Sequence, residues 1–197
     1  MYYKKRSGTV NIFILNEDPV IAAQEQCDKH VVKMILESAQ MLSTAHRILD
    51  GSETRRPSKS GKTMSKYWVL PDPEKENLFY KAVHAGHPCT VWTMESVSNY
   101  NWHYKHFVAL CREYTYRYGK IHKSDKDLLG PLCSPPRNIS RGRLTPFKLA
   151  MGAAPECMFP DRPVESYQKF YQTKQERFKM SWTKRDIPGW FTTYANI

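Results

Sequence analysis

Two long stretches with a helical repeat of apolar side chains constrain the fold of this chain most strongly. The first covers residues 18–49, with a break expected near Cys27, and the second covers residues 90–118. In each stretch, apolar residues recur three or four positions apart and line one helical face. The second stretch ends before Gly119, a residue suited to the left-handed conformation that follows a helix. These patterns predict a mainly helical protein.

The remaining elements are shorter. Residues 9–15 read as one buried strand, residues 50–72 as a long loop, and residues 73–83 and 164–180 as further helices. We therefore predict a mainly α, compact single-domain orthogonal helical bundle with one short N-terminal strand and long basic loops. Residues 1–8 are expected to form a basic arm, and residues 9–197 a single domain.

Positive charge is concentrated in three tracts. The formal net charge is +11, and residues 54–70 and 128–155 contain no acidic side chain at all. The N-terminal arm adds Lys4, Lys5 and Arg6. Concentrated positive charge is what a polyanionic ligand requires. The chain is therefore expected to bind DNA or an anionic nucleotide, with solvated basic loops as the alternative interpretation.

The sequence carries no signal for a membrane or for secretion. No apolar run approaches the length of about 20 residues that a membrane span needs. The apolar stretch 10–15 is too brief for a secretion signal. The five cysteines include no Cys-x-x-Cys pair and are expected to be free thiols. We expect a cytoplasmic protein, in the host cytoplasm if the source is viral, that is a monomer, with an oligomer left open.

No metal or cofactor is predicted. His84 and His87, and again His103 and His106, are spaced as metal ligands on a helix would be, but neither pair is joined by a third ligand. The segment 56–63 resembles a phosphate-binding loop, yet Arg56 replaces its first glycine and no strand precedes it.

The densest mixture of acid, amine and imidazole lies between Cys27 and Lys33. Asp28 is suited to cap a helix and the lysines to face solvent, which is the structural interpretation. The functional interpretation is that a nearby cation lowers the pKa of a lysine, so that its neutral amine can act as a nucleophile. On a helix, His30, Lys33 and Glu37 share one face. The candidate catalytic residues are Asp28, Lys29, His30, Lys33 and Glu37.

Candidate DNA-binding residues come from the basic tracts, from the histidine before the second long helix, and from the aromatic C-terminal segment. Cationic side chains would contact phosphates, and flat rings would stack on bases. The candidates are Arg55, Arg56, His87, Arg141, Arg143, Lys184, Arg185 and Trp190.

Three short islands carry a resemblance to a known family. They are the helix with Lys29, His30 and Lys33, the string Gly86-His87-Pro88-Cys89-Thr90 before a long helix, and the terminal Pro188-Gly189-Trp190-Phe191. Together they resemble the phage-type pyrimidine-dimer DNA glycosylases, and the string Asp-Lys-His-Val-Val-Lys also resembles one found in uncharacterised viral proteins. The resemblance covers about a third of the chain.

The resemblance implies a small helical enzyme that flips a nucleotide out of the duplex, cleaves an N-glycosidic bond and then nicks the strand. The family uses an amine that forms an imine with the sugar, a glutamate, and arginines that hold phosphates. At the positions of Lys29, His30 and Lys33 it shows Arg, Glu and Arg, and its amine is a processed N-terminus. Two interpretations therefore stay open: Lys29 supplies the amine with Asp28 or Glu37 as carboxylate, or the fold carries other chemistry.

The expected function is a DNA-acting N-glycosylase of viral type, a hydrolase of DNA repair or modification with an associated lyase activity. The alternatives are a non-catalytic DNA- or nucleotide-binding module, and a nucleotide-acting enzyme on the same scaffold, including one that serves viral counter-defence.

Overall fold

The computed structural model describes residues 10–58 and 60–194. The basic arm 1–8, with Lys4, Lys5 and Arg6, lies outside the described residues, as does Lys59 of the basic tract 54–70. The division into an arm and a single domain therefore stays a prediction.

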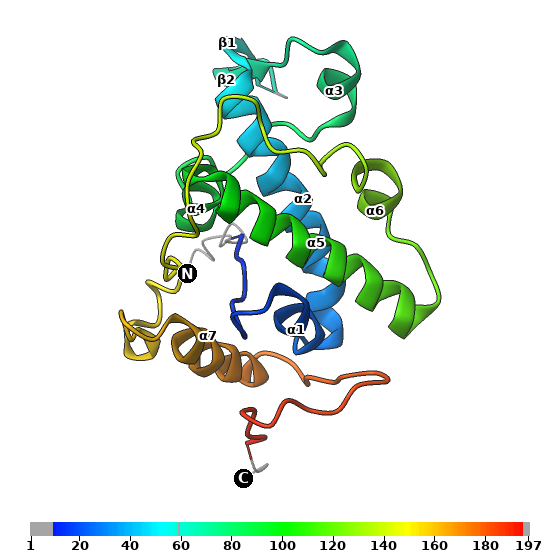
Figure 1. Ribbon diagram of the computed structural model, residues 1–197, viewed down its shortest axis with the longest axis vertical. Helices are drawn as coiled ribbons and strands as arrows, with labels where there is room; N and C mark the ends of the chain where they lie inside the picture. The colour runs from blue at the N-terminus through cyan, green and yellow to red at the C-terminus, as the bar shows by residue number, and fades with distance from the viewer. Residues whose placement is uncertain (1–9, 59, 195–197) are drawn as a thin grey trace.

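Two long helices, α2 (Asp28–Asp50) and α5 (Val97–Tyr118), cross at the centre of the molecule (Figure 1). Helix α1 (Pro19–Gln24) packs on α5, and α4 (Pro88–Glu95) packs on both long helices. Helix α6 (Lys123–Leu128) lies beside α2. Helix α7 (Pro163–Gln172) lies toward the opposite end of the molecule from the sheet. Two short 3-10 helices, η1 (Pro155–Cys157) and η2 (Thr173–Glu176), flank α7 in the sequence.

Local capping explains where α1 begins and why the second predicted helical stretch is divided. Asp18 accepts hydrogen bonds from Val20 and Ile21 at the start of α1, and a new helix then begins at Asp28. In the second stretch, the Ser96 side chain caps α5 by accepting from the amide of Asn99. Ser96 itself is extended, so residues 88–118 form two helices rather than the one predicted helix. The predicted end at Gly119 is confirmed, with a φ of 65°.

The only sheet in the described part of the chain is an antiparallel hairpin of β1 (Ser52–Pro57) and β2 (Met64–Val69). The sequence predicts a loop over residues 50–72, because this stretch is rich in Ser, Gly and Pro. The hairpin is exposed on most of its length, so its backbone pairing owes little to burial.

The hairpin is attached to α2 by one buried guanidinium. Arg47 donates hydrogen bonds to the carbonyls of Trp68 and Phe79 and to the carboxylate of Glu76. Glu76 lies in α3 (Pro73–Leu78), which ends at Leu78 rather than at residue 83 as predicted. Burial alone would raise the pKa of Glu76, but hydrogen bonds from Tyr67, Leu70 and Arg47 lower it to about 2. This ion pair therefore stays charged at neutral pH.

The predicted N-terminal strand is wrong. Residues 10–15 are extended and buried, but they pair with no other strand among the described residues, and Thr9 lies outside them. Side chains replace a neighbouring strand as hydrogen-bond partners: Glu37 accepts from the Asn11 amide, and Gln168 donates to the Leu15 carbonyl. The segment is held by the core instead, because five of its six side chains are apolar.

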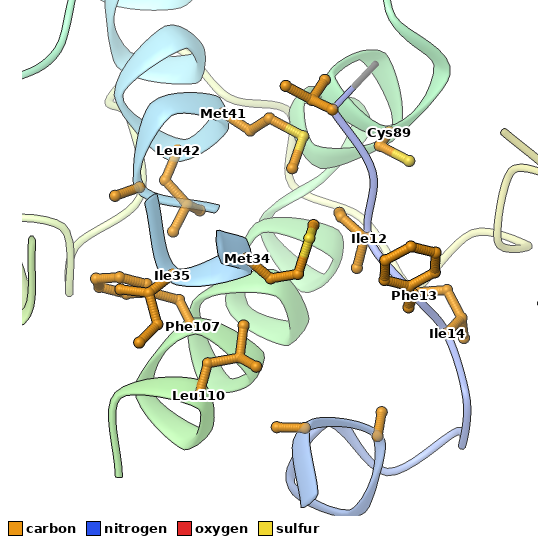
Figure 2. Packing of buried hydrophobic residues seen from close by; sticks show 14 of the residues in the cluster. Ile12, Phe13, Ile14, Met34, Ile35, Met41, Leu42, Cys89, Phe107 and Leu110 are labelled. Atoms are coloured by element: carbon orange, nitrogen blue, oxygen red, sulfur yellow. The ribbon is translucent and has the colours of Figure 1, made fainter. Parts of the chain in front are cut away.

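The core lies between this N-terminal segment, α2 and α5. Figure 2 shows Met34 of α2 reaching toward Ile12, while Ile35 of α2 and Phe107 and Leu110 of α5 occupy the same buried cluster. Helices make up 48% of the structure, and a two-stranded sheet is present. The predicted compact orthogonal bundle with a single N-terminal strand is therefore wrong, since the sheet arises where a loop was expected and the expected strand forms none.

Candidate functional site

The string from Asp28 to Glu37 forms the first part of α2, as the sequence predicts. Successive helical residues are about 100° apart, so Asp28 and His30 point to different sides. His30, Lys33 and Glu37 share one face. The structure therefore divides the five candidate catalytic residues into two environments.

The Asp28 carboxylate is fully engaged in hydrogen bonds. It accepts from the Thr183 amide at 2.9 Å and hydroxyl at 2.8 Å, from the Ser181 hydroxyl at 2.9 Å, and from Arg117 at 3.0 Å. Burial alone would raise the pKa of Asp28, but these hydrogen bonds outweigh it and lower the pKa. Asp28 is thus a buried anion that attaches the C-terminal segment to the start of α2.

Two candidate DNA-binding residues, Lys184 and Arg185, make contacts within the protein close to this network. Arg117 also contacts Glu113 at 3.1 Å, and Arg185 binds both oxygens of Glu113, at 2.6 and 3.1 Å. Lys184 donates to the Tyr116 carbonyl at 2.8 Å and lies over the Tyr116 ring. Arg185 is therefore a partner of a buried carboxylate, and Lys184 holds the C-terminal segment against α5.

His30 lies in a buried aromatic environment. Its Nδ1 is 2.7 Å from the Tyr171 hydroxyl, which accepts from the Cys27 amide at 2.9 Å. The rings of Phe13 and Phe178 lie 4.8 and 5.5 Å from the imidazole. Burial, followed by the charges of Lys33, Lys174 and Arg177, lowers the pKa of His30 to about 3. The ring is neutral at pH 7, and we assign Nδ1 as the acceptor of the tyrosine proton.

Cations surround this aromatic layer. The Lys29 ammonium lies 4.6 Å from the Phe178 ring centre, and the Lys174 ammonium lies 3.4 Å from that of Phe170. Burial, then the charge of Arg177, lowers the pKa of the half-buried Lys174 to about 8. We name this group the basic aromatic cluster; it consists of Phe13, Lys29, His30, Lys33, Phe170, Tyr171, Lys174, Arg177 and Phe178.

Glu37 lies at the inner edge of this cluster. One carboxylate oxygen is 2.8 Å from the Lys33 ammonium, and the other accepts from the Asn11 amide at 3.1 Å. The Asn11 side chain in turn accepts from the thiol of Cys89 at 3.5 Å. Burial raises the pKa of Cys89 to about 11, so this thiol is not a nucleophile at neutral pH.

Three other candidate DNA-binding residues are not members of the cluster. Arg55 and Arg56 are on the exposed strand β1, where the Arg56 guanidinium stacks over Tyr67 at 3.7 Å. His87 caps α4 by accepting from the Cys89 amide, which makes it a structural residue. The structure does not bring these three side chains together with the face of α2.

Two further candidates, Arg141 and Arg143, are exposed on a loop beside the start of α5. The Ser96 hydroxyl donates to the Arg143 carbonyl, which holds this loop in place. Trp190 is half-buried and packs edge-on against Tyr171, 6.0 Å between ring centres. Trp190 therefore packs against Tyr171 of the basic aromatic cluster.

Sequence analysis missed Lys174, Arg177, Tyr171 and Phe178. A signal was present: Phe170, Tyr171, Lys174, Arg177 and Phe178 recur at helical spacing and bring rings and cations to one side. The pattern alone does not say that this side faces His30.

Among residues 10–58 and 60–194, no group of three or more His, Cys, Asp or Glu side chains is placed to hold a metal ion. In the same residues, no helix is both long and apolar enough to cross a membrane. No protein-family model matches the chain, and no curated protein or solved structure shows significant similarity to it.

Proposed function

We propose that this protein binds nucleic acid through the basic aromatic cluster. The observation that carries this proposal is the arrangement of Lys29, Lys33, Lys174 and Arg177 around buried rings. Within residues 10–58 and 60–194, Glu37 is the one acid that pairs with any of these cations. Like charges gathered on one surface repel one another, and a bound phosphate relieves that repulsion. The flat rings of Phe170 and Phe178, both half-buried, offer stacking surfaces for bases.

Charge alone does not single out this cluster, because the hairpin is also basic. On the hairpin, Lys66 pairs with Glu53 at 2.9 Å and Arg56 stacks on Tyr67, much as Lys33 pairs with Glu37 and Lys174 stacks on Phe170 in the cluster. At the cluster, however, cations from two separate parts of the chain converge, and three of them lie near enough to His30 to lower its pKa. Convergence of this kind is typical of a binding surface rather than of a solvated helix face.

The test is a binding titration with fluorescently labelled duplex and single-stranded DNA. A triple variant, Lys29→Gln, Lys174→Gln and Arg177→Gln, is compared with a matched control, Lys120→Gln, Lys123→Gln and Lys126→Gln, whose exposed lysines lie near α6. We expect the cluster variant to lose roughly tenfold or more in affinity and the slope of log affinity against log salt to fall by about 0.9 per duplex contact removed. Equal losses in both variants, or no binding by the unaltered protein at low salt, would contradict the proposal.

A specific observation favours a second candidate function, the DNA N-glycosylase with lyase activity. With its pKa near 8, the amine of Lys174 is neutral in about a tenth of molecules at pH 7. A neutral amine attacks the sugar carbon, the glycosidic bond breaks, and the base leaves with the bonding pair and takes up a proton. The sugar ring then opens as the imine forms. Lys174 therefore joins Lys29 as a candidate nucleophile, and Glu37, which pairs with Lys33, is the candidate carboxylate.

Borohydride trapping on a panel of damaged duplexes distinguishes the two amines. If Lys174 is the nucleophile, Lys174→Arg abolishes the trapped adduct, while Lys29→Arg retains it and DNA binding stays intact in both. If only Lys29→Arg abolishes the adduct, Lys29 is the nucleophile. No adduct on any substrate would leave the binding function without the enzymatic one.

A further inference from the structure

A groove of about 630 Å³ lies on the side of α5 that packs against α1, outside the basic aromatic cluster. Its floor is aliphatic and comes from three elements of the chain. Val20 of α1 is 42% exposed there, whereas Ala22 and Ala23 are the residues of α1 that are buried. Exposed aliphatic side chains that line a concave surface favour an apolar occupant. By the floor we mean the aliphatic part of the lining, which consists of Val20, Val108, Ala109 and Leu129; Gln24, Tyr104 and Tyr116 also line the groove.

The charges at the groove are positive and unbalanced. Lys105 and Arg112 are exposed, and neither pairs with a carboxylate among the described residues. The one acid that lines the groove is Glu113. Its carboxylate binds Arg117 and two nitrogens of Arg185. Glu113 therefore has no charge left to neutralise the two free cations.

The two free cations have a spacing that selects one kind of ligand. Lys105 and Arg112 are seven residues apart on α5, which is two turns or about 10.5 Å along the helix axis. Val108 and Ala109 lie between them on the same face. A second helix laid along α5 matches this pattern when it carries acids seven positions apart with apolar residues between them.

From this arrangement we infer that the groove binds an acidic amphipathic helix of a partner protein. Carboxylates of the partner contact Lys105 and Arg112, and its apolar side chains cover the aliphatic floor. A nucleic-acid strand fits less well, because its closely spaced phosphates would lie against Val108 and Ala109, which offer no hydrogen-bond donor from their side chains. The hydroxyls of Tyr104 and Tyr116 already donate to backbone carbonyls, and Arg185 is bound to Glu113. The inference is independent of nucleic-acid binding at the basic aromatic cluster.

The test uses a stapled helical peptide with two glutamates seven positions apart and two leucines between them, and a second peptide with lysines in place of the glutamates. We expect the unaltered protein to bind the glutamate peptide roughly tenfold more tightly than the lysine peptide, as measured by fluorescence anisotropy. The double variant Lys105→Glu, Arg112→Glu should reverse this preference. Both substitutions are at exposed positions, and circular dichroism verifies that the fold is retained.

A matched control variant, Arg55→Glu and Lys62→Glu, changes the same charge on the hairpin and should keep the original preference. The inference is overturned if the unaltered protein binds neither peptide, or if the control variant changes the preference as much as the groove variant. It is also overturned if DNA displaces the glutamate peptide and the groove variant loses as much affinity for DNA, because the groove then belongs to a nucleic-acid surface.

Discussion

Asp28 and His30 are two residues apart on α2, yet they belong to regions of opposite character. Around Asp28, the carboxylate accepts from Thr183, Ser181 and Arg117, so its negative charge is matched. Around His30, the neighbouring charges of Lys33, Lys174 and Arg177 are all positive, and only Glu37 is in direct contact to offset them.

The difference shows that charged residues adjacent in a helix can have separate roles, one in stability and one in ligand binding. A carboxylate whose oxygens are all occupied contributes to stability and has no capacity left for a ligand. A group of cations with few acids costs electrostatic free energy in the folded protein, and a bound anion recovers it. Variants of residues in either region test this difference.

The largest effect is expected on the Asp28 side. Asp28→Ala leaves the fully buried Arg117 guanidinium with one acid, Glu113, that Arg185 already shares. We expect the free energy of unfolding to fall by about 3–5 kcal/mol in urea denaturation. The control is Asp161→Ala, which removes an exposed acid outside the network. If Asp28→Ala is as stable as the control but no longer binds DNA, Asp28 belongs to the binding surface instead.

Acidification should affect the His30 side next. Because burial lowers the folded-state pKa of His30 to about 3, below its unfolded value near 6.5, the unfolded chain binds the proton first. Stability from this residue is therefore present at neutral pH and is lost as pH falls from about 6.5 toward 3. In that window, His30 should cost the unaltered protein roughly 1.4 kcal/mol of unfolding free energy for each pH unit of acidification. The His30→Gln variant should lack this contribution, so its unfolding free energy should fall less on acidification. An unchanged pH dependence of the melting temperature would show that His30 is protonated in the folded protein.

A smaller effect is expected when one cation of the cluster is removed. Arg177 is exposed, so Arg177→Ala should change the free energy of unfolding by less than about 0.5 kcal/mol. If Arg177 contacts a phosphate, DNA affinity falls and the salt dependence becomes shallower by about 0.9. Salt titrations of the variant and of Lys120→Ala, an exposed lysine near α6, measure this. An identical slope for both variants would remove Arg177 from the binding surface.

The smallest effect is expected at Lys33. Its ion pair with Glu37 is 2.8 Å long, but the lysine side chain is 54% exposed, so solvent screens the interaction. We expect Lys33→Ala to lower the free energy of unfolding by no more than about 0.5 kcal/mol in urea denaturation. A loss comparable to that of Asp28→Ala would mean that the two regions do not differ in the way proposed.

Local signals in the sequence predicted both long helical stretches, the start of the first stretch at Asp18 and the end of α5 at Gly119. Asp18 and Gly119 act through contacts within a few residues, and such signals can be read from the chain directly. The shared face of His30, Lys33 and Glu37 also follows from helical spacing alone. The break at Ser96 was missed, although serine is favoured at the start of a helix over its interior.

Tertiary structure decided the rest. Whether residues 10–15 pair as a strand depends on partners such as Glu37 and Gln168, which are distant in sequence. Asp28 became a buried anion because Arg117 and Thr183 reach it from the middle and the end of the chain, at separations of 89 and 155 residues. Helical periodicity states which side chains share a face. Only the packing of distant segments decides whether that face meets a carboxylate, another cation or solvent, because these interactions depend on distance in space.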